Sequence, residues 1–305
     1  MSSPLKITIL GCHSATPKTK AFPTAQVVEV RGQLLLIDCG EGTQVRLREN
    51  SIKFNQIKHV FISHLHGDHF YGLIGFLSTL SLLNRTNPIT IFAPKGAKEI
   101  IELQLNYSGS YLTFPIHFIE LNSTQSELIC DEEKFSVRTI PLDHRIYTNG
   151  FLVVEKEGKR KLNIEKVEEL NIDKAYYQKI VKGEDIELED GLIIMNEAIT
   201  FPPKPAKSYA FCSDTAYKPD IVPLIKKATV LYHESTFLET HLALCQKTKH
   251  STAKQAGRIA KKAEVEHLIL GHYSSRYKNL EDFRTEAQTA FENVELAESG
   301  KTFVF

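Results

Sequence analysis

The sequence predicts an α/β protein. Short runs rich in Val, Ile, Leu and Phe, bounded by Gly, Pro, Asn or Asp, alternate with segments of helical periodicity. The chain has 305 residues, of which 42% are hydrophobic, so it can bury a large core as one domain or two smaller ones. A charged fraction of 24% and the lack of low-complexity tracts argue against a disordered protein.

The apolar runs predict strands and the periodic segments predict helices, in alternation along the chain. Strands are expected at residues 7–10, 26–30, 33–37, 59–63, 89–93, 116–121, 135–140, 151–154, 209–213, 230–233 and 267–270. Helices are expected near residues 41–49, 69–83, 95–105, 219–227, 252–264 and 280–291. In 252–264, alanines and Ile259 recur every three or four residues and form one apolar face, and Ser251 or Thr252 can cap the first turn.

Composition also restricts the environment and the partners. The 37 basic and 37 acidic residues balance, so bulk charge gives no indication of a nucleic-acid or membrane partner, although a local basic patch stays possible. No stretch of 18 uninterrupted apolar residues predicts a membrane span. The odd number of cysteines, without a CxxC pair, predicts no disulfide framework and a cytoplasmic location; they are Cys12, Cys39, Cys130, Cys212 and Cys245.

Residues 155–207 interrupt the alternating pattern. This stretch is dense in charge and poor in the apolar runs that build a core. Such segments are usually solvated excursions from a domain. The alternative is an arm that contacts a partner.

The string His64-Leu65-His66-Gly67-Asp68-His69 is the strongest functional motif. It places four potential metal ligands directly after a predicted strand. In an extended chain, residues two apart point the same way, so His64 and His66 can share one metal ion. Gly67 then permits a turn that directs Asp68 and His69 to a neighbouring point.

Three further predicted strands run into a potential ligand, namely His144, Asp214 and His272. Ligands in an open α/β sheet bind at the carboxyl ends of strands, so these residues can converge with the first motif. The resulting five His and two Asp are too many for one tetrahedral ion and suit two ions bridged by a carboxylate. Imidazole and carboxylate ligands without thiolate favour Zn²⁺ over Mn²⁺ or Fe²⁺, and the cysteines are interpreted as small buried residues.

These motifs resemble those of the metallo-β-lactamase superfamily and, within it, the ribonuclease Z family. The resemblance covers the whole chain in order. Beyond the metal motif it rests on four strings, which are DCGEGTQ (38–44), HEST (233–236), HST (250–252) and GHYSSRY (271–277). It implies an αβ/βα sandwich of two mixed β-sheets flanked by helices, as a single domain over 1–305 with a charged protruding arm at roughly 155–207. It also implies a homodimer.

The resemblance further implies the distribution of ligands and a reaction. One Zn²⁺ is expected on His64, His66 and His144, and a second on Asp68, His69 and His272, with Asp214 bridging. The expected reaction is hydrolysis of a phosphodiester in precursor tRNA, which leaves a 3′-hydroxyl on the tRNA and a 5′-phosphate on the trailer.

Other residues receive roles by hypothesis. Asp68 accepts a proton from the attacking water, while His250 donates one to the leaving oxygen and Glu234 holds His250 in the required tautomer. The alternative for His250 is a residue beside a helix cap. Phosphates of the RNA are expected to contact Lys156, Lys159, Arg160 and Lys161, and Tyr176 and Tyr177 either stack on RNA or pack within the arm.

Several polar residues are given no direct role. Asp38 is expected to brace a loop and His233 to pack behind the site; His13, His59, His117, His241 and His267 receive no role. The alternative function on the same fold is hydrolysis of a small phosphodiester or another small molecule, because a fold does not specify a substrate. A binding or scaffold protein is disfavoured, since all seven expected ligands are present.

Overall fold

A computed structural model describes residues 4–16, 19–188 and 191–305. The chain divides into two compact units. We call Glu155–Ala206 the arm, and the remainder, which extends to Val154 and resumes at Lys207, the body. In the part of the chain that the structure describes, no helix combines the length and the apolarity needed to cross a membrane.

The body contains two seven-stranded mixed sheets. In the first sheet, β18, β1, β2 and β3 are paired antiparallel, each with the next. From β3 onward, the neighbouring strands β3, β4, β5 and β6 are parallel. Its strands in spatial order are β18 (Thr302–Val304), β1 (Lys6–Gly11), β2 (Ala25–Val30), β3 (Gln33–Ile37), β4 (Ile57–Phe61), β5 (Ile89–Pro94) and β6 (Ile116–Leu121).

The second sheet comes mostly from the C-terminal half of the body. Four parallel strands, β14 to β17, continue into an antiparallel neighbour, β9, and a hairpin. Its strands in spatial order are β17 (Val294–Leu296), β16 (His267–Gly271), β15 (Val230–Glu234), β14 (Ser208–Cys212), β9 (Asn149–Glu155), β8 (Phe135–Pro141) and β7 (Leu128–Asp131).

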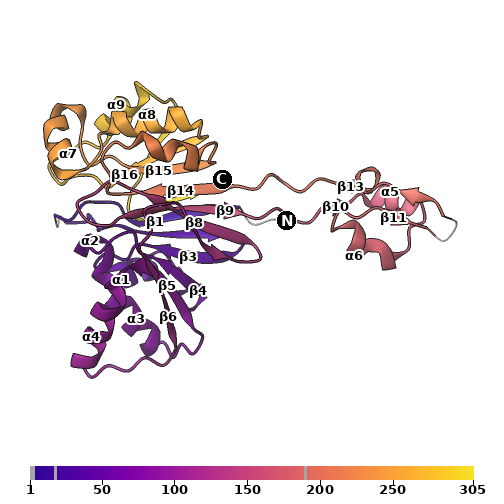
Figure 1. Cartoon of the computed structure of the whole chain (residues 1–305), viewed down its shortest axis with the longest axis horizontal. Coiled ribbons are helices and arrows are strands. Elements are labelled where there is room, and N and C mark those ends of the chain that lie inside the picture. Colours follow the sequence, from indigo (N-terminus) through magenta and orange to yellow (C-terminus); the bar gives the residue numbers. More distant parts are fainter. Residues whose placement is uncertain (1–3, 17–18, 189–190) are drawn as a thin grey trace. The chain divides into compact units, whose positions relative to one another are not determined.

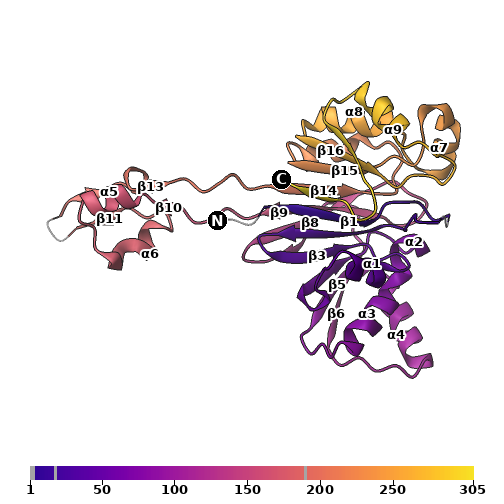
Figure 2. The same ribbon diagram turned by 180° about the vertical axis from the view of Figure 1, so that it is seen from behind.

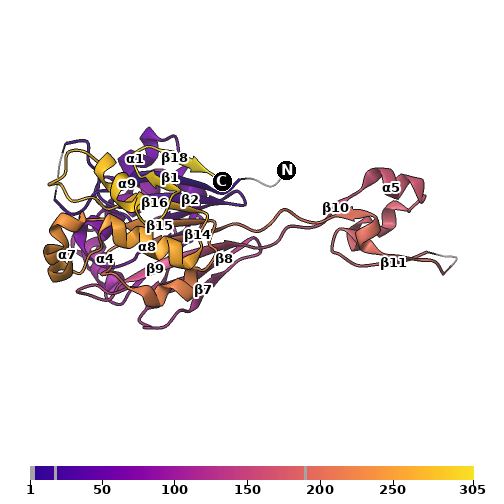
Figure 3. The same cartoon turned by 90° about the horizontal axis from the view of Figure 1, so that it is seen from above.

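Helices cover the outer face of each sheet, so the predicted αβ/βα sandwich is confirmed. The helices α1 (Thr43–Glu49), α3 (Gly72–Leu82) and α4 (Ala97–Tyr107) lie outside the first sheet (Figure 1). The helices α8 (Ala253–Ala263) and α9 (Glu281–Gln288) lie outside the second sheet (Figures 2 and 3). One apolar cluster fills the space between the sheets and beneath α8 and α9, and another fills the space beneath α1 and α3.

The predicted helix at 252–264 shows how local sequence determines an element. Every alanine of its apolar face, together with Ile259, is buried. Thr252 is the N-cap, and it forms a capping box in which its hydroxyl accepts from the Gln255 amide and the Gln255 side chain accepts in return. The helix is therefore confirmed, and of the two candidate caps, Ser251 and Thr252, it is Thr252 that caps the first turn.

Other predicted elements differ from the structure. The helix expected at 69–83 is two helices, α2 (Gly67–Phe70) and α3, which meet at Tyr71. Residues Pro219–Ile225 form a 3₁₀ helix rather than an α-helix, and Pro223 within it lacks the amide that an α-helix requires. The short strands β7, β17 and β18 and helix α7 (Leu242–Thr248) were not predicted.

The arm has a small core of its own, which its charge-dense sequence did not predict. Short elements, among them α5 (Ile164–Glu169), α6 (Tyr177–Ile180) and the paired strands β10 (Lys161–Leu162) and β13 (Thr200–Phe201), enclose it. Five isoleucines and one valine are buried there, namely Val167, Ile172, Ile180, Ile186, Ile194 and Ile199. Tyr176 and Tyr177 pack against this core.

Candidate metal centre

The predicted ligands gather at one end of the body because each follows a strand. His64 comes soon after β4, while Asp214 follows the end of β14 by two positions and His272 follows the end of β16 by one. These strands are parallel within their sheets, so their carboxyl ends open onto the same rim. A cavity of about 390 Å³ lies there, and His66, Asp68, Asp214, His250 and His272 are among the residues that line it.

The first group of ligand atoms consists of His64, His66, His144 and one oxygen of Asp214, all within 4.8 Å of one another. The His64 Nε2 and His66 Nδ1 atoms are 3.0 Å apart. Oδ2 of Asp214 lies 3.7 Å from Nε2 of both His64 and His144. Four ligands at the usual zinc distances of 2.0–2.1 Å are about 3.3 Å apart at the corners of a tetrahedron, so this group is close to that size.

The second group consists of Asp68, His69 and His272, again within 4.8 Å of one another. The Nε2 atoms of His69 and His272 are 3.4 Å apart. The other oxygen of Asp214, Oδ1, lies 3.2 Å from Nε2 of His69 and 3.1 Å from Nε2 of His272. Asp214 therefore presents one oxygen to each group, as a bridging ligand requires.

The charges of the site also favour cations. Asp38, Asp68, Asp214 and Glu234 are all buried, and buried carboxylates are costly unless positive charge accompanies them. Burial opposes the ionisation of Asp68 and Asp214, yet the neighbouring histidines lower the pKa of both carboxyl groups below the ordinary value. The site thus keeps ionised ligands.

The histidines of the first group are suited to the neutral form that binds metal. Burial lowers the pKa of His64, His66 and His144 below the ordinary value. Nε2 of His144 is buried without a hydrogen-bond partner among the described residues, which a metal ion corrects. His69 differs: although burial opposes its protonation, Asp214, Asp38 and Asp68 raise its pKa, so metal binding there releases a proton. The residues present therefore fit a metal site.

Supporting hydrogen bonds orient the ligating rings. Nδ1 of His69 lies 2.6 Å from Asp38, whose carboxylate also accepts from the amide and the hydroxyl of Ser63. Nδ1 of His272 lies 2.8 Å from the Thr236 hydroxyl, and Nδ1 of His144 donates to the Lys249 carbonyl at 3.0 Å. Such partners fix the tautomer and the orientation of a metal-binding ring.

Asp38→Asn tests this support. Asparagine keeps the shape and tolerates the left-handed conformation of this position (φ 57°), but it lacks the charge that accepts from Nδ1 of His69. We expect metal affinity to fall about 10- to 100-fold, as supporting partners of metal ligands typically contribute, with the fold retained. Competition with a chromophoric chelator measures this loss, and an unchanged affinity would contradict the role given to Asp38.

His250, which is partly buried, and Glu234, which is buried, form a pair beside the second group. Nδ1 of His250 lies 2.8 Å from Oε1 of Glu234, so its other nitrogen, Nε2, is left for the cavity that His250 lines. Burial opposes protonation of His250, but the Glu234 carboxylate raises its pKa to about 9. Thr215 and Thr236 donate backbone amides to the same carboxylate, which fixes Glu234 itself.

Backbone strain gathers at the same rim. Asp38, Asp214 and His272 have φ of 57°, 56° and 59°, and each follows the last residue of a strand by one or two positions. A non-glycine residue in this left-handed region costs about 1–3 kcal/mol, and such residues concentrate at functional sites. The left-handed backbone conformation thus occurs at two members of the ligand groups, Asp214 and His272, and at Asp38, which contacts a third member, His69.

The reason for the glycine in the metal motif differs from the prediction. Gly67 is the first residue of α2, and its φ is not positive, so its backbone does not need the conformational freedom of glycine. A Cβ atom there would lie 2.5 Å from the ring of Tyr71, so glycine leaves room for that ring to lie against the start of the helix. His233 is buried behind the site as expected, with Nδ1 donating to the Glu234 carbonyl.

The four basic residues predicted to contact RNA lie at the start of the arm. Lys159 and Lys161 are exposed, whereas Lys156 and Arg160 are half-buried. Nε of Arg160 donates to the Thr200 hydroxyl at 2.7 Å, so that guanidinium is partly engaged within the arm.

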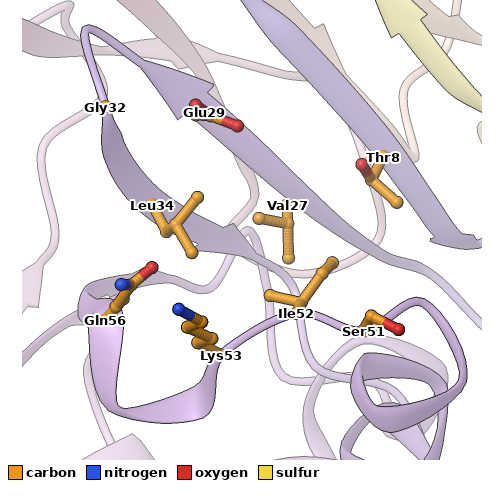
Figure 4. Close-up of a pocket in the computed structure, with 9 residues that line it drawn as sticks. All are labelled: Thr8, Val27, Glu29, Gly32, Leu34, Ser51, Ile52, Lys53 and Gln56. Carbon is orange, nitrogen blue, oxygen red and sulfur yellow. The ribbon is translucent and has the colours of Figure 1, made fainter.

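Another surface cavity, of about 250 Å³, contains none of the predicted site residues. It lies between the strands β1 to β3 and the chain after α1 (Figure 4). Its lining mixes isolated charges with aliphatic side chains and brings no two metal ligands together; the lining residues are Thr8, Val27, Glu29, Gly32, Leu34, Ser51, Ile52, Lys53 and Gln56.

Comparisons with known proteins agree with this geometry. A family model described as Anti-Pycsar protein Apyc1 matches residues 5–148. A ribonuclease Z of Bacteroides fragilis is 41% identical over 289 residues, which cover 95% of each chain. The crystal structure of human tRNase Z, short form, is 28% identical, covers 98% of each chain and has a TM-score of 0.71. The metallo-β-lactamase fold protein YhfI of Bacillus subtilis, 18% identical with a TM-score of 0.69 over 99% of this chain and 100% of its own, shares the fold.

Proposed function

This chain belongs to the ribonuclease Z family, and we propose that it removes the 3′ trailer from precursor tRNA by metal-dependent hydrolysis. The observation that carries the proposal is the bridging position of Asp214 between two ligand groups, with the His250–Glu234 pair beside them. The family model that matches only residues 5–148 excludes Asp214, His250 and His272, so it is the relatives over the whole chain that support the choice of substrate.

We propose that the site holds two Zn²⁺ ions. His64, His66 and His144 would hold one, Asp68, His69 and His272 would hold the other, and Asp214 would serve both. Mn²⁺ or Fe²⁺ would suit the same ligands less well. When bound, such ions lower the pKa of water and offset negative charge on phosphate oxygens.

The residues of the chain complete the reaction. Asp68 takes the proton of the water that attacks phosphorus, and His250 donates a proton from Nε2 to the 3′ oxygen as the P–O3′ bond breaks. The tRNA then ends in a 3′-hydroxyl, and the phosphate stays on the trailer as its 5′-phosphate. Glu234 keeps His250 protonated, consistent with the pKa of about 9 in the metal-free protein.

Incubation of the purified protein with a 3′-extended precursor tRNA tests the proposal. We expect one cut next to the discriminator base, a 3′-hydroxyl and a 5′-phosphate at the new ends, and loss of cleavage with a chelator. Hydrolysis of small phosphodiesters without cleavage of the precursor would instead support the alternative enzyme on the same fold.

We also propose that the arm binds the phosphates of the tRNA. The arm as a whole carries more acidic than basic residues, so any contact with RNA has to be local. Support comes from the adjacency of two basic stretches: the Arg160 amide donates to the Val181 carbonyl, which brings Lys159 and Lys161 near Lys182.

Reversing the charges at Lys159→Glu and Lys161→Glu tests the arm while preserving its small core, to which neither side chain belongs. We expect KM for precursor tRNA to rise about tenfold and the slope of log affinity against log salt to fall by about 2, since each lysine contributes roughly one phosphate contact. Steady-state kinetics at several salt concentrations measure both. Arg258→Glu with Lys261→Glu, on the exposed side of α8, is the matched control, and an equal effect there would contradict the proposal.

We further propose that the chain acts as a homodimer in the cytoplasm. The exposed apolar side chains on and after α4, among them Leu103 and Tyr107, support a buried interface at that helix. Light scattering on the full chain tests the oligomeric state. Five cysteines, all buried and outside disulfides, support a reducing compartment.

A further inference from the structure

His59, Cys130 and Glu132 form a second cluster of metal-ligand types in the body. One potential ligand atom of each lies within 4.8 Å of the others, and His59 Nε2 is 3.3 Å from Oε1 of Glu132. His59 belongs to β4 of the first sheet, whereas Cys130 belongs to β7 of the second sheet and Glu132 follows that strand. The cluster therefore connects the two sheets.

The cluster is partly enclosed and open on one side. The rings of Phe61, Phe92 and Phe135 lie 5.9–6.5 Å from the His59 ring, centroid to centroid, and Cys130 is buried. The Glu132 side chain is 50% exposed, so it can move toward an ion and water can reach the same point. Burial lowers the pKa of His59, with Glu132 opposing the change, which leaves the imidazole in the neutral form that binds metal.

The chemistry of the three groups suits zinc in particular. Imidazole, thiolate and carboxylate are all zinc ligands, and three protein ligands with one water form a common four-coordinate site. Usual zinc distances place such ligand atoms about 3.3–3.6 Å apart, so the His59–Glu132 separation already fits and the thiol, which lies within 4.8 Å of both partners, has to approach by at most about 1.2 Å. A site for Mg²⁺ or Ca²⁺, which prefer oxygen ligands, is not indicated.

We propose that His59, Cys130 and Glu132 form an additional Zn²⁺ site, separate from the catalytic centre, that links the two sheets. His59 precedes His64 by five residues, which is roughly 16 Å of extended chain. The ion joins β4 to β7, the terminal strand of its sheet, and so stabilises an edge that otherwise has a single neighbouring strand. The inference is independent of the reaction that the other site catalyses.

Cobalt substitution of the full-length protein tests the proposal. None of the ligands assigned to the catalytic centre is a thiol, so sulfur-to-cobalt charge transfer in the near ultraviolet reports the new cluster alone. With saturating Co²⁺ in thiol-free buffer, we expect this band in the unaltered protein and its loss in Cys130→Ser, together with one Co²⁺ fewer per chain. Glu132→Gln, at a half-exposed position, should keep the fold and weaken binding of this ion at least about tenfold.

Cys12→Ser is the matched control, since Cys12 is also buried but contacts the Ala297 carbonyl and belongs to no such cluster. It should retain the band and the full cobalt content. Absence of a charge-transfer band in the unaltered protein, or a band that survives Cys130→Ser, would overturn the proposal. Cleavage of precursor tRNA by Cys130→Ser at saturating zinc should stay within about twofold of the unaltered protein. If Cys130→Ser lost cleavage although its catalytic centre still bound its full share of cobalt, the proposal would also be overturned.

Discussion

Asp214→Ala is expected to empty both ligand groups of metal and to lower cleavage of precursor tRNA at least about a thousandfold. The two carboxylate oxygens face different groups, at 3.1 and 3.2 Å from the second and 3.7 Å from the first. Metal ions in such sites supply several kcal/mol of transition-state stabilisation, and about 4 kcal/mol corresponds to a thousandfold in rate. Elemental analysis of the purified variant and single-turnover cleavage measure the two effects.

Two further variants make this result interpretable. Asp214 has φ 56°, a conformation that alanine adopts at a cost but asparagine tolerates, so Asp214→Asn should keep the fold and still lose metal because it lacks the charge. His117→Ala removes an exposed histidine outside the site and should change neither metal content nor rate. Retention of both ions by Asp214→Ala would show that the two groups do not depend on a shared carboxylate.

Much of this centre follows from the sequence because its ligands obey a simple rule of topology. His64 to His69 are contiguous, and His144, Asp214 and His272 each follow a recognisable apolar strand. Parallel strands place their carboxyl ends together, so an interpretation from sequence can gather residues more than 200 positions apart. The structure brings all seven together.

The supporting partners follow a different rule, and the sequence alone did not reveal them. Asp38 reaches Ser63 and His69 because β3 and β4 are paired with Ile37 opposite Phe61, a register that no local pattern encodes. The partner of His144 is the backbone carbonyl of Lys249, and the type of residue at position 249 does not indicate that its carbonyl accepts this hydrogen bond. For Asp38, its position directly after a predicted strand was the only available indication.

The unpredicted elements are those whose order depends on neighbours. The strands β17 and β18 have three residues each and form at the margins of the two sheets. In the arm, isolated isoleucines separated by charged residues lack the periodicity of a strand or helix, yet the turns between them bring the side chains into one core. A core of this kind is visible in the three-dimensional structure but not in the sequence pattern.

His250→Ala is expected to lower kcat for precursor tRNA by about 100- to 10,000-fold, the usual contribution of a general acid, without loss of metal. KM should change little, because the proton is transferred only as the P–O3′ bond breaks. Elemental analysis separates this role from the alternative that His250 is itself a ligand, since it lies within 4.8 Å of Asp214 and His272. Loss of metal in His250→Ala would contradict the general-acid role.

The pH dependence gives this role a second test, through the partner that maintains the proton. In the protein without metal, burial opposes protonation of His250 but the Glu234 carboxylate raises its pKa to about 9, so there the proton is retained at neutral pH and lost as the pH rises through about 9. A raised pKa also means that the pair stabilises the folded state fully below about pH 6.5 and loses this contribution as the pH rises through about 9.

Glu234→Gln removes the charge, so the alkaline decline of kcat should move down by about 1–2 pH units, the effect of one nearby opposite charge. A pH–rate profile measured on metal-replete enzyme resolves this shift. An unmoved alkaline limb in Glu234→Gln would mean that another group protonates the leaving oxygen.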